Sequence, residues 1–288
     1  MEIIVGKTAG FCFGVRNAVE KSKKCLEEND TVYCLGELVH NRQVVDKLEK
    51  NGLKVIETIN EAPDNEKVII RAHGIAKNIY EEILKKKIDM LDLTCIKVLQ
   101  IHEIVEEYSN DGFFIIYIGE KNHPETLGTI SFAGQNKCII EEENEIENNI
   151  VKIIEQKIEK VLIISQTTFN LEKFIRFSQI IENKLRKNCV IEIKNTVCNA
   201  TRLRQEETEK IAKSVDCMII IGGKKSSNTK KLYEISCKNC KIVFNVETKN
   251  DLINEIEKLK KFTKIGVMAG ASTPQDSIEE IENLLKSI

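Results

Sequence analysis

The chain has 288 residues and a formal net charge of −2, so we expect no nucleic-acid partner. Its longest purely apolar run, 113–118, is too short to cross a bilayer, and residues 1–10 lack the character of a signal peptide, so we expect no membrane association. Ten cysteines without a secretion signal favour a reducing, cytoplasmic location, where thiols serve as core residues, metal ligands or nucleophiles.

Short apolar runs alternate with helical patterns along the chain. The runs are rich in Ile and Val and mostly continuous, as in strands that are covered on both faces of a parallel sheet. We expect strands at 2–5, 32–35, 68–70, 113–118, 161–164, 217–221, 242–244 and 264–268. We expect helices at 15–29, 96–108, 171–185, 202–214 and 277–285. Strands that alternate with helices predict an α/β fold.

Three cysteines occupy the same position in a repeated sequence pattern. The same distance of 28 residues separates Cys12 from His40, Cys95 from His123, and Cys198 from Ser226. Equal offsets in dissimilar sequence predict a triplicated structural unit. We therefore expect three small α/β units with mostly parallel sheets in a pseudo-threefold arrangement. Their predicted ranges are 14–94, 95–197 and 198–288, and residues 1–13 provide a further N-terminal strand and the first of the cysteines.

The three phased cysteines predict a metal centre. Cys12, Cys95 and Cys198 each precede a predicted helix, whose N-terminus stabilises the thiolate form. Structural zinc usually takes a fourth protein ligand from closely spaced pairs, whereas three cysteines on an iron–sulfur cubane leave one iron open to substrate. Cys237 and Cys240 form the only Cys-x-x-Cys pair, and because this pair stands alone we interpret it as structural.

Polar loops follow six of the predicted strands, where α/β proteins bind their ligands. Three of the four histidines, His40, His73 and His123, lie on these loops, whereas His102 lies in a helical pattern and is expected to be structural. Glu125 is the only carboxylate on the loops and is a candidate acid, with a solvated loop carboxylate as the alternative. The loops are 38–42, 71–74, 122–129, 165–168, 222–229 and 269–274.

Nine motifs on these segments resemble those of the 4-hydroxy-3-methylbut-2-enyl diphosphate reductases, the IspH/LytB family. They are AGFCFGV (9–15), LVHN (38–41), AHG (72–74), DLTC (92–95), NHPETLGT (122–129), SQTT (165–168), VCNAT (197–201), SSNT (226–229) and AGASTP (269–274). Ile96, Asn122 and Asn199 depart from residues that are frequent in the family, and none of these changes removes a group with a role.

The resemblance implies three α/β units around one 4Fe-4S cluster. It implies that the cluster is held by Cys12, Cys95 and Cys198, and that Glu125 is the proton source while Thr167 holds the substrate hydroxyl. The implied ligands of the substrate diphosphate are His40, His73, His123, Ser226, Ser227, Asn228 and Ser272. The implied reaction is the reductive dehydroxylation of (E)-4-hydroxy-3-methylbut-2-enyl diphosphate to isopentenyl and dimethylallyl diphosphate, the last step of the non-mevalonate isoprenoid pathway, with electrons from ferredoxin or flavodoxin.

Two other functions are compatible with three cysteines at one point. A cluster-dependent dehydratase or synthase would use the same open iron without an external electron donor. A scaffold stabilised by zinc or a cluster would have no turnover. The loops 122–129 and 226–229 favour the reductase, and six polar loops at strand ends are too many for a scaffold. Visible absorption separates zinc, which is colourless, from a brown cubane.

Overall fold

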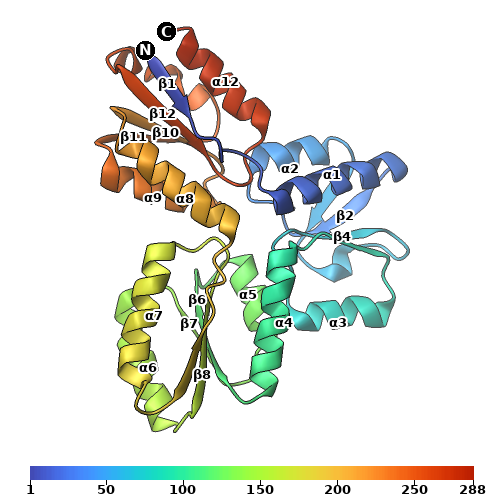
Figure 1. The fold of residues 1–288 in the computed structure, drawn as a ribbon. Coiled ribbons are helices and arrows are strands. Elements are labelled where there is room, and N and C mark those ends of the chain that lie inside the picture. Colours follow the sequence, from blue (N-terminus) through green and yellow to red (C-terminus); the bar gives the residue numbers. More distant parts are fainter. The chain divides into compact units, whose positions relative to one another are not determined.

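The computed structural model describes residues 1–288 and confirms the predicted α/β fold, with three four-stranded parallel sheets (Figure 1). The first has the order β1 (Glu2–Val5), β12 (Lys264–Ala269), β10 (Cys217–Ile221), β11 (Ile242–Val246). The second has the order β3 (Leu53–Ile56), β2 (Val32–Leu35), β4 (Val68–Ile70), β5 (Met90–Asp92). The third has the order β7 (Lys137–Ile140), β6 (Phe114–Ile118), β8 (Lys160–Ser165), β9 (Val190–Ile193).

Helices connect the strands, as parallel pairing requires. They are α1 (Phe13–Glu28), α2 (Arg42–Glu49), α3 (Lys77–Lys86), α4 (Ile96–Asn110), α5 (Pro124–Ile130), α6 (Ile146–Glu155), α7 (Leu171–Leu185), α8 (Asn199–Ala212), α9 (Ser227–Asn239), α10 (Asn250–Ile253), α11 (Ile256–Leu259) and α12 (Gln275–Lys286). Short 3₁₀ turns lie at Ile59–Glu61 and Glu143–Glu145. None of these helices combines the length and the apolar character that crossing a bilayer demands.

The chain divides into two compact units. One comprises 1–31, 37–54 and 199–288, and the other comprises 32–36 and 55–198. The first unit contains the sheet that begins with β1, which pairs in parallel with β12 from Glu2 opposite Lys264 to Val5 opposite Val267. The N-terminal strand therefore extends the sheet of the third predicted segment. The division of the repeat at 14–94, 95–197 and 198–288 remains a prediction.

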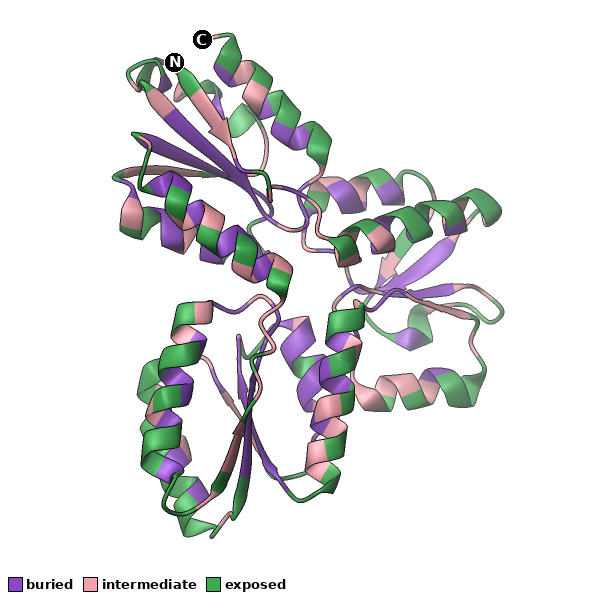
Figure 2. Ribbon diagram, viewed as in Figure 1, coloured by how far each residue is buried: buried purple, intermediate pink, exposed green.

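In the second unit, the sheet of β6 and β8 lies between two helical layers (Figure 1). Phe114, Ile116 and Ile118 pack toward α6 and α7, whereas Ile115 and Tyr117 pack toward α4 and α5. This alternation follows from the two-residue period of a strand. All five residues of β6 are buried, as the purple colour of the central strands in Figure 2 shows. Because both faces are covered, β6 is a continuous apolar run in the sequence.

In the first unit, helices also cover both faces of the sheet (Figure 1). Ile219 and Ile221 of β10 pack with Ile281 of α12, and the alternate residues of β10 pack toward α8 and α9. The carboxyl ends of β10 and β12 lead directly into the loops 222–226 and 270–274, which carry the polar residues predicted from the sequence. The fold thus places these loops at one edge of a buried sheet, where α/β proteins bind ligands.

Candidate functional site

Each of the three phased cysteines stands directly before a helix and donates its backbone N–H to a loop carbonyl. The acceptor is in every case the second residue after a central strand, which gives the three cysteines equivalent surroundings. The three hydrogen bonds join Cys12 to Ala271 (3.1 Å), Cys95 to Ala72 (3.0 Å) and Cys198 to Thr167 (2.9 Å). This equivalence is what a triplicated structural unit predicts.

The thiols of these cysteines suit a thiolate-bound metal centre. Cys12, Cys95 and Cys198 form no disulfide and are partly exposed, and they directly precede the helices α1, α4 and α8. An iron–sulfur cluster is held by cysteine thiolates. Cys240, by contrast, is buried, with Sγ 3.4 Å from the carbonyl oxygen of Ile242, as expected for a structural residue.

The segment 122–129 was predicted to be a loop, but most of it forms helix α5. Pro124 occupies the first turn, where its missing N–H costs nothing, and His123 caps the helix. The His123 Nδ1 accepts a hydrogen bond from the Glu125 N–H at 3.1 Å. Because Nδ1 is the acceptor, the proton of the neutral ring is on Nε2, which is therefore a hydrogen-bond donor for an anion.

Glu125 is a buried carboxyl and not a solvated loop residue. It is 2% exposed, and Thr167 donates to both of its oxygens: the N–H to Oε1 and the hydroxyl to Oε2, each at 2.6 Å. The hydroxyl of Tyr117 lies 3.4 Å from Oε1. Burial raises the pKa of Glu125, and the bonds from Thr167 oppose part of that rise. A raised carboxyl pKa is what a general acid needs near neutral pH.

Tyr117 was not among the residues that the sequence predicted for the site. It belongs to the continuous apolar strand β6, and only the alternation of that strand turns its ring toward α5. Burial and the nearby Glu125 raise the pKa of Tyr117 well above its ordinary value, so it stays a protonated hydrogen-bond donor. A tyrosine in an apolar run carries no sequence signal for this position.

His73 and His123 meet where the loop after β4 contacts α5. Their ring centroids are 5.3 Å apart and the rings are almost perpendicular. Gly128 of α5 lies against the same loop, and a Cβ there would lie 3.3 Å from the carbonyl oxygen of Ile75, closer than an ordinary contact. The Ser131 hydroxyl accepts the Lys77 N–H at 2.8 Å and holds the same junction. The structure thus brings His73, His123 and Glu125 together with Thr167.

In the other compact unit, His40 and Ser272 are neighbours. The Ser272 hydroxyl donates to the His40 carbonyl at 3.2 Å. Gly223 also approaches His40 closely, since a Cβ at Gly223 would lie 2.5 Å from that same carbonyl oxygen. Only a glycine permits the loop after β10 to come this near. The loops 38–42, 222–229 and 269–274 are therefore contiguous, as a shared ligand site requires.

The predicted loop 222–229 is in part the first turn of α9. Ser226 caps the helix, its hydroxyl accepting the Thr229 N–H at 3.3 Å, and Ser227 and Asn228 form the first turn. Asn228 is 2% exposed, and neither its amide nitrogen nor its amide oxygen has a hydrogen-bond partner. Buried amides are rarely left unpaired, so this side chain is suited to a ligand at a helix N-terminus, where anions bind.

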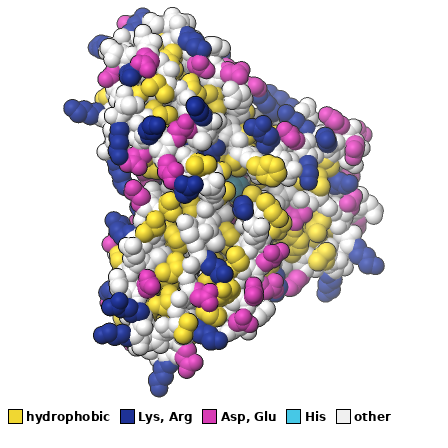
Figure 3. Space-filling model, in the orientation of Figure 1, with side chains coloured by type: hydrophobic (Ala, Val, Ile, Leu, Met, Phe, Trp, Pro, Cys, Tyr) yellow, Lys and Arg dark blue, Asp and Glu magenta, His cyan; other side chains and the backbone are white.

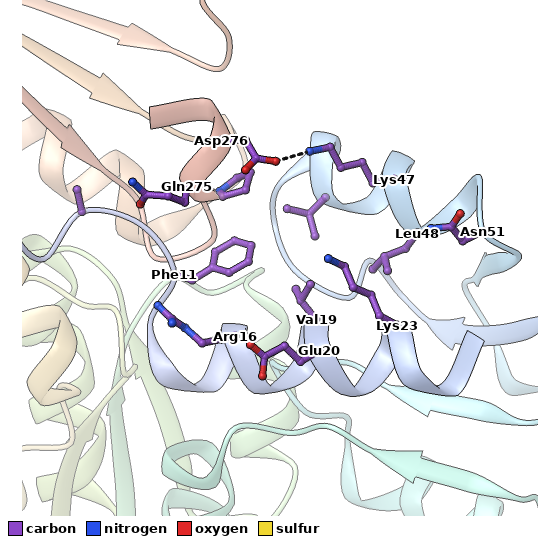
Figure 4. Close-up of a pocket in the computed structure, with 13 residues that line it drawn as sticks. Phe11, Arg16, Val19, Glu20, Lys23, Lys47, Leu48, Asn51, Gln275 and Asp276 are labelled. Carbon is purple, nitrogen blue, oxygen red and sulfur yellow. Dashed lines mark hydrogen bonds and ion pairs between the residues drawn. The ribbon is translucent and has the colours of Figure 1, made fainter. Parts of the chain in front are cut away.

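A separate groove of about 520 Å³ lies beside the Cys12 loop (Figure 4). It is formed by α1, α2 and the start of α12, and an ion pair between Lys47 and Asp276 at 3.1 Å spans one side of it. None of the predicted site residues lines this groove. Phe11, which precedes Cys12, is one of the residues that line the groove.

On the face shown in Figure 3, basic and acidic side chains are intermixed.

The chain is thus an α/β protein with three parallel sheets. The paired rings of His73 and His123 lie near a buried carboxyl, and three cysteines each directly precede a helix. Residues 3–286 match the family model described as LytB protein. The chain belongs to the LytB family.

Named relatives of the chain carry one activity in their names. A "4-hydroxy-3-methylbut-2-enyl diphosphate reductase" of Clostridioides difficile is 41% identical over 289 residues and covers 100% of both chains. A solved structure titled as the E-1-hydroxy-2-methyl-but-2-enyl-4-diphosphate reductase of Plasmodium falciparum has a TM-score of 0.90 at 33% identity, covering 98% of this chain and 87% of that one. Another, titled as the terminal enzyme of the non-mevalonate pathway, has a TM-score of 0.71 at 36% identity and covers 100% of both.

Proposed function

We propose that this chain converts (E)-4-hydroxy-3-methylbut-2-enyl diphosphate to isopentenyl and dimethylallyl diphosphate, the last step of the non-mevalonate isoprenoid pathway. Family membership and the names of full-length relatives support the activity. The structural observation that best supports the proposed reaction is the buried carboxyl of Glu125, both of whose oxygens accept hydrogen bonds from Thr167. The alternatives of a dehydratase or an inert scaffold have no such relatives among those named above.

We further propose that Cys12, Cys95 and Cys198 hold one 4Fe-4S cluster. Their thiols outside any disulfide, their positions before helix starts and their equivalent backbone hydrogen bonds support this assignment. When bound, the cluster would supply two electrons one at a time and, at the iron without a protein ligand, Lewis-acid character. The electrons would come from ferredoxin or flavodoxin. The ten cysteines, none of them in a disulfide, support a reducing, cytoplasmic location.

The substrate diphosphate is assigned to the imidazoles and to the polar residues at the start of α9. The Nε2–H of His123 is a hydrogen-bond donor, and the buried amide of Asn228 has no hydrogen-bond partner in the protein. Neutral donors and a helix N-terminus hold an anion without a cluster of lysines. The proposed set is His40, His73, His123, Ser226, Ser227, Asn228 and Ser272. Binding energy from the diphosphate would hold the allylic end in place.

Glu125 is assigned the proton transfer and Thr167 the positioning of the substrate hydroxyl. The bond between the allylic carbon and the hydroxyl oxygen breaks, two electrons and two protons are consumed, and water leaves with either product. Hydroxide is a poor leaving group, so a protonated Glu125 would deliver the proton that converts it to water. Tyr117 would keep the carboxyl oriented from the strand side.

Anaerobic reconstitution with iron and sulfide, followed by turnover with a reduced dye and the diphosphate substrate, tests the proposal. We expect a brown protein that forms both products. Replacing Cys12, Cys95 or Cys198 with Ala should abolish the visible absorption, whereas Cys237→Ala, at an exposed thiol on α9, should leave it unchanged. A colourless wild-type protein, or dehydration without consumption of electrons, would reject the assignment.

A further inference from the structure

The segment that leads to Cys12 is longer than its two counterparts. Six residues, 6–11, connect β1 to Cys12, whereas two residues precede Cys95 after β5 and four precede Cys198 after β9. A longer connection has more conformations available, so fixing its last residue costs more conformational entropy. Cys12 therefore needs additional contacts if its thiol is to occupy one position.

Arg204 of α8 supplies part of these contacts. Its side chain is 3% exposed, and the guanidinium donates from Nε to the Thr8 carbonyl and from Nη2 to the Gly10 carbonyl, both at 2.8 Å. Gly10 has a φ of +95°, a conformation that few other residues adopt. The planar fork of arginine is suited to two acceptors at a fixed separation. Arg204 thus fixes the turn two residues before Cys12.

Glu207 holds the same segment one helical turn further along α8. Its Oε1 accepts the Lys7 N–H at 2.8 Å, and its Oε2 accepts the N–H and the hydroxyl of Thr8 at 2.8 and 2.5 Å. Partial burial opposes ionisation, but these hydrogen bonds prevail and lower the pKa of Glu207. The carboxylate is therefore charged at neutral pH, and charge-assisted hydrogen bonds are about twice as strong as neutral ones.

The pair is specific to the helix that follows Cys198. The sixth and ninth residues after Cys198 are Arg204 and Glu207. At the same offsets after Cys12 stand Ala18 and Lys21, and after Cys95 stand Ile101 and Ile104. Among α1, α4 and α8, only α8 therefore has an arginine and a glutamate at these positions, and these two side chains contact residues 7, 8 and 10. On the other side of the same segment, Ala9 and Phe11 line the groove formed by α1, α2 and the start of α12.

We propose that Arg204 and Glu207 are positioning residues that hold the segment 7–10 and thereby fix Cys12 for cluster binding. This inference rests on the proposed function only in taking Cys12 as a cluster ligand. The hydrogen bonds that both residues make to the segment preceding Cys12 are with its backbone and the Thr8 hydroxyl. Their role is to preorganise one of three ligands, which reduces the entropy lost when the metal centre forms.

Two conservative variants test the proposal in the full-length protein. Arg204→Lys keeps the charge but replaces the planar two-nitrogen fork with a single ammonium nitrogen, and Glu207→Gln leaves only one side-chain oxygen to accept hydrogen bonds. The matched controls are Arg202→Lys and Glu206→Gln, at an exposed ion pair of 2.6 Å on the same helix. We expect amide exchange in residues 7–12 and the rate of cluster loss to chelator to rise about tenfold in the test variants only, as expected for lost charge-assisted bonds.

A selective readout separates positioning from general destabilisation. In cluster-free protein, alkylation of Cys12 by iodoacetamide should accelerate relative to Cys95 and Cys198 within the same molecule. Equal acceleration at all three cysteines, or no change, would overturn the proposal. The paramagnetic resonance spectrum of the reduced cluster should also change in Arg204→Lys. If the wild-type chain binds no cluster, the proposed function fails, but amide exchange and alkylation still report on the Arg204–Glu207 contacts.

Discussion

Thr167 donates to both carboxylate oxygens of Glu125, through its N–H and its hydroxyl, each at 2.6 Å. The carbonyl of the same threonine accepts the N–H of Cys198 at 2.9 Å. One residue after β8 therefore connects the candidate acid on α5 with a candidate cluster ligand. This arrangement fixes the acid relative to the backbone of Cys198, and both contacts lie within one compact unit.

Glu125→Gln is expected to lower turnover by about 10²–10⁴-fold, because the amide keeps the size of the side chain but cannot deliver the proton. Cluster absorption should not change, since Glu125 is not a proposed ligand. The matched control is Glu172→Gln, which alters an exposed glutamate in the first turn of α7, as Glu125 is in the first turn of α5. Single-turnover and steady-state assays measure both, and near-normal rates for Glu125→Gln would remove its catalytic role.

Thr167→Val removes the hydroxyl and keeps the backbone N–H. The hydroxyl bond lowers the pKa of Glu125, so its loss should raise that pKa further. Because the protonated carboxyl is the active form, activity falls as pH rises through the pKa, and the alkaline limb of the rate profile should move to higher pH. Thr168→Val removes a neighbouring hydroxyl that contacts Gln166 instead, and it should leave the limb in place.

An alkaline limb that stays unchanged in Thr167→Val would show that another group controls it. A lower maximal rate alone would not support the assignment of Glu125, since lost positioning of the substrate has the same effect.

Asn228→Leu is expected to separate binding from stability. An unpaired buried amide costs about 1–3 kcal/mol, so a leucine of similar size should raise the free energy of unfolding of the ligand-free protein by about that amount. The same change should raise the Kd of the diphosphate substrate at least about tenfold, because a charged ligand loses a donor. Asn239→Leu, near the other end of α9, breaks a bond to Ile235 and should do neither. Calorimetry and denaturant titration provide the measurements.

His102 should make the fold sensitive to acid. The structure places it on α4 with its ring stacked on Phe132 at 4.3 Å and 3% exposed, as expected for a structural residue. Burial lowers the pKa of His102 from 6.5 to about 4. Because the folded pKa is the lower one, the unfolded chain takes up the proton first, and stability declines as pH falls from about 6.5 to about 4.

His102→Leu should remove this contribution, at most about 1.4 kcal/mol per pH unit. Melting temperatures of the cluster-free protein across this range measure the slope. Identical slopes for the wild type and His102→Leu would contradict the expectation.

The sequence predicted the buried strands because burial on both faces leaves an uninterrupted apolar run. All eight strands predicted from the sequence are present, among them β2, β6 and β10. The four that it did not predict, β3, β5, β7 and β9, are the outer strands of their sheets. Outer strands are covered less completely, as the partial exposure of β9 shows, so their residues are mixed in character. The repeated offset of 28 residues after each of the three cysteines is likewise a property of the order of residues along the chain.

Tertiary structure alone decided which polar groups are buried and what they contact. From the sequence, a solvated carboxylate was an alternative for Glu125. In the structure Glu125 is buried and hydrogen-bonded to Thr167 on the loop after β8. Tyr117 acquired its role from the side of β6 that it occupies, and Arg204 from the segment that packs against α8. Periodicity and spacing are local properties of a chain, and the sequence determined those. Burial and hydrogen-bond partners depend on residues that are far apart in the chain, such as Thr8 and Arg204, 196 positions apart, which only the folded chain brings together.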